Sequence, residues 1–92
     1  MDYVCRKVQL QPGDKVVEIG SGWGALALHM AKYYGVTVSA FNISKEQLLF
    51  ARALAKRENL SRQVEFIEGD YRNISGHYDA IVSVGMLEHV GS

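Results

Sequence analysis

The glycine-rich stretch VVEIGSGWGAL, at residues 16–26, constrains the fold more than any other part of the sequence. A short apolar run leads into Gly20, Gly22 and Gly24, and a segment rich in Ala and Leu follows. Glycines are needed where the main chain takes a positive φ or where a ligand approaches bare backbone. The pattern predicts a strand, a tight turn and a helix whose free N–H groups and positive end face the turn.

The spacing of the glycines and the residue before them indicate the kind of ligand. Dinucleotide-binding turns follow G-x-G-x-x-G, and here Ala25 occupies the position of the third glycine. Glu18 lies two residues before the first glycine, where its charge suits a ligand with a positive group and suits a pyrophosphate poorly. S-adenosylmethionine, with its ammonium and sulfonium groups, is such a ligand. The alternative is a tight turn that binds nothing.

Strands and helices alternate along the rest of the chain. We expect helices at 3–10, 25–34 and 44–60, and strands at 15–20, 36–43, 63–69 and 78–85. The alternation predicts right-handed crossovers and a parallel sheet, and the nearly continuous apolar strands predict that both faces of the sheet are covered. The expected fold class is therefore α/β, a truncated Rossmann-like, doubly wound parallel sheet of about four strands with helices on both faces.

The composition and the charge balance limit which partners and which cellular compartment we expect for the chain. Ten basic residues balance ten acidic ones, which gives no electrostatic reason to expect nucleic acid as a partner. The single cysteine, Cys5, fits a reducing compartment, and we expect a cytoplasmic protein without a metal site. The 92 residues are enough for one small domain.

Four stretches together resemble a known family of enzymes. They are LQPGDKVVEIGSGWGALALHMAKYYGVTV, NISKEQ, EGDYRN and YDAIVSVGMLEHVG. They are similar to successive motifs of the cyclopropane-fatty-acyl-phospholipid synthase family, a group of class I S-adenosylmethionine-dependent methyltransferases that includes mycolic acid cyclopropane synthases. The resemblance implies that residues 1–92 are the S-adenosylmethionine-binding part of a class I methyltransferase domain.

The implied function is methyl transfer from S-adenosylmethionine in lipid biosynthesis, as methylene addition to unsaturated fatty acyl chains of phospholipids. In the full-length protein this implies a lipid substrate and a place in the cytoplasm, peripheral to the membrane. Two alternatives stay open. One is a small-molecule N- or O-methyltransferase, since plant alkaloid N-methyltransferases share much of the pattern. The other is a non-catalytic fragment or scaffold module.

The resemblance also implies a set of cofactor-binding residues. They are Glu18, Gly20, Ser21, Gly22, Trp23, Gly24, Asn42, Gln47, Asp70 and Tyr71. Asn42 occupies a position where many class I methyltransferases carry an acidic residue that holds the ribose hydroxyls, and Gln47 is expected to take over that contact. The alternative for Gln47 is a capping box with Ser44 at a helix start.

Asp70 is expected to accept a hydrogen bond from the adenine amino group, and Tyr71 to stack on the ring. The alternative for this pair is a solvent-facing turn. Trp23 is expected either to cover the ligand or to pack beneath the glycine loop, with the second favoured.

Glu88 is the expected catalytic residue. In the family, the glutamate of this motif helps to bind a bicarbonate ion that acts as general base after methyl transfer, together with groups from later segments. We therefore expect bicarbonate only in a complete family member, and weak cofactor binding with little turnover from these 92 residues alone. The alternative is that Glu88 and His89 cap a strand end in solvent.

The strand order usual for the family is 3-2-1-4. The fourth strand would then be a bare, apolar edge, and we expect the chain to self-associate through it.

Overall fold

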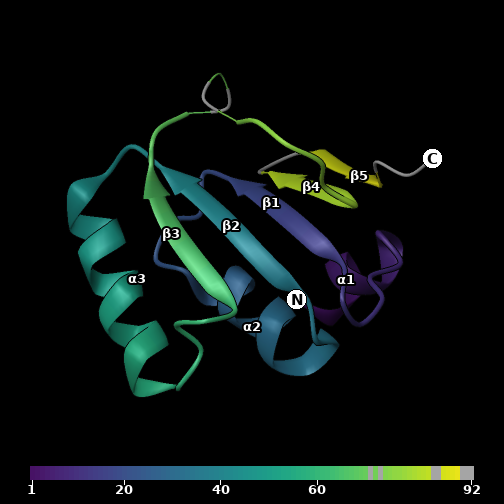
Figure 1. Cartoon of the computed structure of the whole chain (residues 1–92), viewed down its shortest axis with the longest axis horizontal. Coiled ribbons are helices and arrows are strands. Elements are labelled where there is room, and N and C mark those ends of the chain that lie inside the picture. Colours follow the sequence, from purple (N-terminus) through teal and green to yellow (C-terminus); the bar gives the residue numbers. More distant parts are fainter. Residues whose placement is uncertain (71, 73, 84–85, 90–92) are drawn as a thin grey trace.

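Helices and strands alternate through residue 68 of the computed structural model, which describes residues 1–70, 72, 74–83 and 86–89, the last four by their backbone alone. The helices are α1 (Asp2–Lys7), α2 (Ala25–Tyr34) and α3 (Lys45–Arg57) (Figure 1). The strands are β1 (Lys15–Ile19), β2 (Thr37–Asn42), β3 (Val64–Glu68), β4 (Ala80–Ser83) and β5 (Met86–His89). The first four strands and all three helices were expected from the sequence, with ends that differ by a few residues.

The strands form a single sheet in the order β3-β2-β1-β4-β5. The pairs β1–β2, β1–β4 and β2–β3 are parallel, which confirms the α/β fold class and the order 3-2-1-4. Because parallel strands point the same way, β1, β2 and β3 all end at one edge of the sheet (Figure 1). The loops that carry the expected cofactor residues therefore start from the same edge.

The fifth strand was not expected. β5 pairs antiparallel with β4, with Met86 opposite Ser83 and His89 opposite Ala80. The prediction of a bare β4 edge is therefore wrong. An uncovered edge presents unpaired N–H and C=O groups, and the backbone of β5 pairs with those of β4.

All three described helices pack on one face of the sheet, which differs from the expected cover on both faces. One hydrophobic core joins Cys5 of α1, Met30 of α2 and Leu48 of α3 to strand residues such as Val16 and Phe66. Figure 1 shows α1 and α2 behind the sheet. The steps from β1 to β2 and from β2 to β3 run in the same direction, so right-handed crossovers place their helices on the same side.

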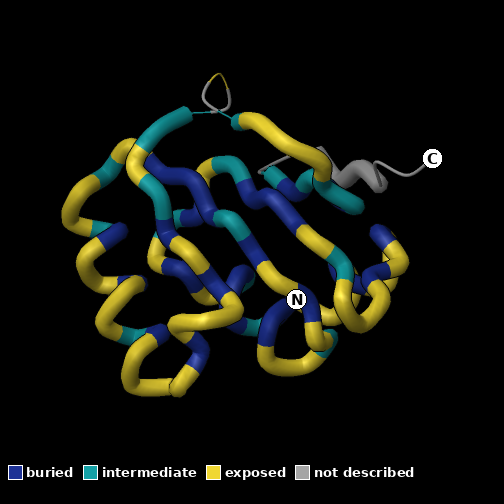
Figure 2. The backbone as a smooth tube through the Cα atoms, viewed as in Figure 1, coloured by how far each residue is buried: buried dark blue, intermediate teal, exposed yellow. Residues whose placement is uncertain are grey.

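The opposite face of the sheet carries the alternate strand residues, which are partly polar, and its apolar residues gather toward the carboxyl ends of the strands. Val17 lies opposite Ile81, and Phe41 lies between Ile19 and Ile67 in the register. Val17 and Phe41 are buried and the three isoleucines are half-buried. Figure 2 shows that most exposed segments lie in the helices and loops around the sheet. No α-helix among the described residues covers this face.

None of the described helices has the length and the apolar composition that crossing a membrane requires.

Candidate functional site

The glycine loop, residues 20–24, connects β1 to α2 at the carboxyl edge of the sheet. The backbone N–H groups of Gly20 and Ser21 both donate to the carbonyl oxygen of Phe41 in β2, over 2.8 and 3.0 Å. Gly20, Gly22 and Gly24 all have positive φ, at 78°, 57° and 93°. The loop therefore turns sharply while staying attached to the neighbouring strand, as the glycine pattern predicted.

The three glycines differ in what surrounds them. A Cβ atom on Gly24 would lie 2.8 Å from the Cβ of Ala51 and 3.0 Å from the Phe66 ring, so this glycine allows close packing of α2 against α3 and β3. A Cβ atom on Gly20 or Gly22 would meet no atom within 4 Å. The open space above the loop therefore lies at Gly20 and Gly22, and Gly24 has a packing role.

Glu18 is a buried acid directly before this loop. Its register with Ala40 and Val82 places it on the helix-covered face of the sheet, and it is 5% exposed. Its Oε1 atom is buried without a hydrogen-bond partner among the described residues. Burial raises the pKa of Glu18 to about 8. A buried carboxyl group without a partner costs free energy, and a cationic ligand would relieve that cost.

Ser21 and the start of α2 supply further unpaired polar groups. The Oγ atom of Ser21 is buried without a partner among the described residues. α2 begins after Gly24, which has no side chain to cap the helix. The first N–H groups of a helix have no partner within it, so this end of α2 offers donors toward the loop.

Asn42 and Gln47 meet beside the glycine loop. Asn42 ends β2 and is 7% exposed, and its Nδ2 atom donates to Gln47 Oε1 over 2.8 Å. Ser44 caps α3, because its Oγ atom accepts from the Gln47 N–H over 3.2 Å. The reciprocal half of the capping box is absent from the described contacts, since the Ser44 N–H donates to Asn42 Oδ1 instead.

Asp70 follows β3 and is held by Arg72. Arg72 Nη2 lies 2.7 Å from Asp70 Oδ2, and the Arg72 backbone N–H donates to Asp70 Oδ1 over 2.9 Å. These hydrogen bonds hold the pKa of Asp70 below its usual value. Sequence reasoning missed the part played by Arg72 here. Tyr71 lies outside the described residues, and both adenine contacts stay predictions.

Trp23 lies at the rim of the loop. Its ring meets the Phe50 ring of α3 edge to face, at 5.2 Å between centroids, and the residue is 48% exposed. It therefore does not pack beneath the loop, which was the favoured expectation. Contact of Trp23 with a ligand stays a prediction.

Glu88 belongs to β5, where its backbone lies opposite Ile81. This register places the backbone of Glu88 beside the body of β4, whereas the sequence suggested a strand end. The side chain lies outside the described part of the chain, and its catalytic role stays a prediction.

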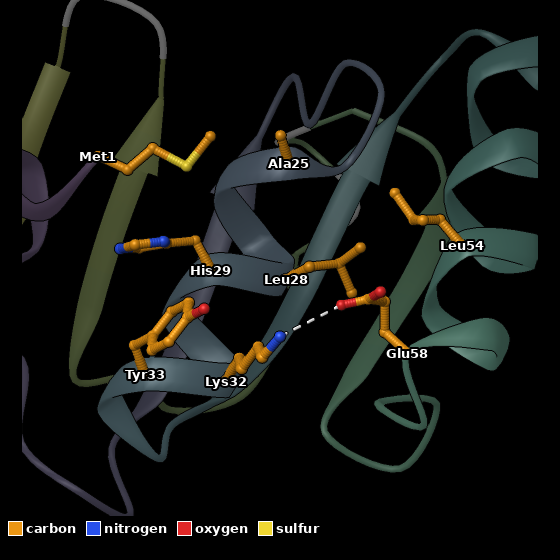
Figure 3. Close-up of a pocket in the computed structure, with 8 residues that line it drawn as sticks. All are labelled: Met1, Ala25, Leu28, His29, Lys32, Tyr33, Leu54 and Glu58. Atoms are coloured by element: carbon orange, nitrogen blue, oxygen red, sulfur yellow. Dashed lines mark ion pairs between the residues drawn. The ribbon is translucent and has the colours of Figure 1, made fainter.

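A separate pocket lies over the helix layer (Figure 3). Its lining includes an ion pair of 3.5 Å between Lys32 of α2 and Glu58 after α3. His29 lines it too, and its Nε2 atom lies within hydrogen-bond distance of Asp2 in α1. None of the expected cofactor residues lines this pocket. In the part of the chain that the structure describes, no three His, Cys, Asp or Glu side chains gather to hold a metal ion.

Comparison with known proteins identifies the family of the chain. Residues 1–92, the whole chain, match the family model described as mycolic acid cyclopropane synthetase. The chain is 44% identical over 88 residues to the cyclopropane-fatty-acyl-phospholipid synthase of Escherichia coli (strain K12). That match covers 96% of this chain and 22% of the relative, so the chain spans less than a quarter of that protein.

Solved structures of methyltransferases share the fold. The mycolic acid cyclopropane synthase CmaA1, complexed with SAH and CTAB, has a TM-score of 0.82 at 28% identity over 89% of this chain and 29% of its own. Coclaurine N-methyltransferase, bound to N-methylheliamine and SAH, has a TM-score of 0.82 at 33% identity over 89% of this chain and 25% of its own. With its whole length matched by the family model, the chain belongs to the mycolic acid cyclopropane synthetase family.

Proposed function

We propose that this chain supplies the S-adenosylmethionine-binding half of an enzyme that adds methylene groups to unsaturated fatty acyl chains of phospholipids. The observation that carries the proposal is the carboxyl group of Glu18, which is buried directly before the glycine loop with Oε1 unpartnered among the described residues. Membership of a family of S-adenosylmethionine-dependent enzymes supports the same ligand. A positively charged ligand would provide the partner that the buried carboxyl group of Glu18 lacks.

The residues present fit S-adenosylmethionine. Glu18 would balance the positive charge of the cofactor. Ser21 Oγ and the N–H groups at the start of α2 would hydrogen-bond its amino acid end. Gly20 and Gly22 leave room for it, because no protein atom lies where their side chains would be. Gln47, at the start of α3, would contact the ribose. When bound, the cofactor would supply an activated methyl group on its sulfonium.

The proposal that a lipid accepts the methyl group rests on the relatives of this chain. The E. coli protein of similar sequence is named for cyclopropane fatty acyl phospholipid synthesis, and this chain covers only 22% of it. We therefore propose weak cofactor binding and little turnover for the 92 residues alone. Glu88 and bicarbonate belong to the proposal for a complete enzyme, which would work in the cytoplasm, peripheral to the membrane that contains its substrate.

A second candidate function is methyl transfer to nitrogen in a small molecule. It is favoured by the 33% identity to coclaurine N-methyltransferase, whose structure has the same fold over this region. The full-length protein distinguishes the two candidates. With methyl-labelled S-adenosylmethionine, transfer of label to unsaturated phospholipid supports the lipid reaction, and transfer of label only to amines supports the alternative.

Calorimetric titration of the chain with S-adenosylmethionine tests the cofactor half of the proposal. We expect binding heat from the chain and none from Glu18→Gln, which keeps the shape of the side chain and removes its charge. A folded chain that gives no heat at millimolar ligand would support the third possibility, a scaffold module without a cofactor.

A further inference from the structure

Asn42 makes three side-chain hydrogen bonds beside the proposed site. Its Nδ2 atom donates to the carbonyl oxygen of Gly22 over 3.1 Å and to Gln47 Oε1 over 2.8 Å. Its Oδ1 atom accepts from the Ser44 N–H over 3.1 Å. A side-chain amide has two N–H donors, so both donors of Asn42 are already used within the protein.

These contacts fix the orientation of the Asn42 amide. If the amide were turned over, its oxygen would face two acceptors, the Gly22 carbonyl and Gln47 Oε1, and its NH2 group would face the Ser44 N–H donor. Only one orientation therefore satisfies all three neighbours. In this orientation Asn42 links the end of β2 and the first turn of α3, which are adjacent in sequence, to the glycine loop about 20 residues earlier.

The orientation of Gln47 follows from that of Asn42. The carbonyl oxygen of the Gln47 side chain accepts from Asn42, and its backbone N–H donates to the Ser44 cap. The NH2 group of Gln47 is the part of the side chain that these bonds leave for a ligand. A ribose hydroxyl oxygen can accept from that group.

We propose that Asn42 is a positioning residue, which holds the Gly22 carbonyl and turns the NH2 group of Gln47 toward the ribose of the cofactor. This inference rests on the proposed function and changes the role expected for Asn42 from the sequence. Gln47 makes the ribose contact, and Asn42 acts through Gln47 and the glycine loop.

The proposal makes an unexpected prediction for aspartate at this position. Many class I methyltransferases carry an acidic residue there, so Asn42→Asp would be expected to strengthen ribose binding. Here a carboxylate oxygen would face the Gly22 carbonyl at the distance of the present hydrogen bond, 3.1 Å, with no proton between them. Two acceptors at that distance repel each other, and Gly22 would move.

The test measures how tightly wild type, Asn42→Asp and Gln47→Ala bind two probes. The probes are S-adenosylhomocysteine and its analogue that lacks both ribose hydroxyls. We expect Asn42→Asp to weaken the binding of both probes by about tenfold, the size of effect that follows from an unpaired buried acceptor. We expect Gln47→Ala to weaken only S-adenosylhomocysteine, because the analogue has no hydroxyl to lose. Circular dichroism confirms that each variant is folded, and Asn42→Ala replaces Asn42→Asp if the aspartate variant is not.

Fluorescence provides a readout that needs no ligand. Trp23 is the single tryptophan of the chain and follows Gly22 directly. We expect Asn42→Asp to shift its emission, because the loop moves, and Gln47→Ala to leave it unchanged. If wild type binds neither probe, the proposed function fails, and the emission still tests the contact between Asn42 and Gly22. Unchanged emission in Asn42→Asp, or tighter binding of S-adenosylhomocysteine by that variant, would overturn the positioning role.

Discussion

The side-chain amide of Asn42 donates to the carbonyl oxygen of Gly22 over 3.1 Å, and in this way the end of β2 holds the loop that follows β1. Backbone hydrogen bonds from the same loop to the carbonyl oxygen of Phe41 also attach the loop to β2. The loop is therefore attached to the sheet before any ligand arrives. What the described site lacks is a partner for the acid beside the loop, Glu18.

Replacing Glu18 should change how stability depends on pH. Burial raises the pKa of Glu18 from 4.5 to about 8, so between these values the folded state holds one proton that the unfolded state has lost. Stability should therefore fall as pH rises through this window, by up to about 5 kcal/mol in total. Glu18→Gln should be more stable than wild type near pH 8. Urea unfolding across the window checks this, and equal slopes in both proteins would refute it.

Two glycine substitutions should separate packing from ligand access. Gly24→Ala places a methyl group against Ala51 and Phe66 and should cost about 2–3 kcal/mol of stability. Gly22→Ala meets no protein atom, so its cost should be the positive φ alone, about 1 kcal/mol. Only the second variant should remain well folded while losing cofactor affinity, and Gly22→Val should abolish binding. Retained binding by Gly22→Val would show that the ligand does not approach this part of the loop.

The cap of α3 should contribute to stability by itself. Ser44→Ala removes the oxygen that accepts from the Gln47 N–H, and should cost about 1 kcal/mol of unfolding free energy. Ser44→Asp supplies another capping oxygen and is the matched control, with a loss of a few tenths of a kcal/mol or none. The cap has no such role if the two variants lose the same amount in urea unfolding.

Self-association stays a prediction, although its expected route has changed. β5 covers the edge of β4. The apolar residues on the face that no described helix covers are now the surface that favours pairing with a second copy. Ile67→Lys on that face should shift sedimentation velocity profiles toward monomer. Leu49→Lys is the control, because Leu49 is an exposed residue of α3 in the helix layer. A wild type that stays monomeric at high concentration would contradict the prediction.

Local signals were enough to predict most of the fold. Ala25 to Tyr34 was expected as a helix and has those bounds, because the glycines before it and Gly35 after it interrupt any regular pattern. The glycine loop and Glu18 could be recognised as candidates for ligand binding because the pattern they form depends only on neighbours in sequence. The strand order came from family resemblance.

Features that depend on distant partners could not be predicted in this way. The bond between Asn42 and Gly22 joins residues 20 positions apart, and no local pattern reveals it. The apolar run that begins with β4 is equally compatible with one longer strand, so the pairing of β5 with β4 was not predicted. Helices on both faces were expected from apolar strands, but strand composition does not determine which side a crossover takes. The handedness of consecutive crossovers does.

The central claim is that Glu18 and the glycine loop bind a cationic cofactor, and calorimetric titration with S-adenosylmethionine near pH 7 tests it most directly. Because Glu18 is expected to be protonated in the free chain at this pH, binding should release close to one proton, which titrations in two buffers of different ionisation enthalpy measure. The account predicts binding heat with proton release for wild type, and neither for Glu18→Gln. Binding of equal strength by Glu18→Gln, or no heat from folded wild type at millimolar ligand, would contradict it.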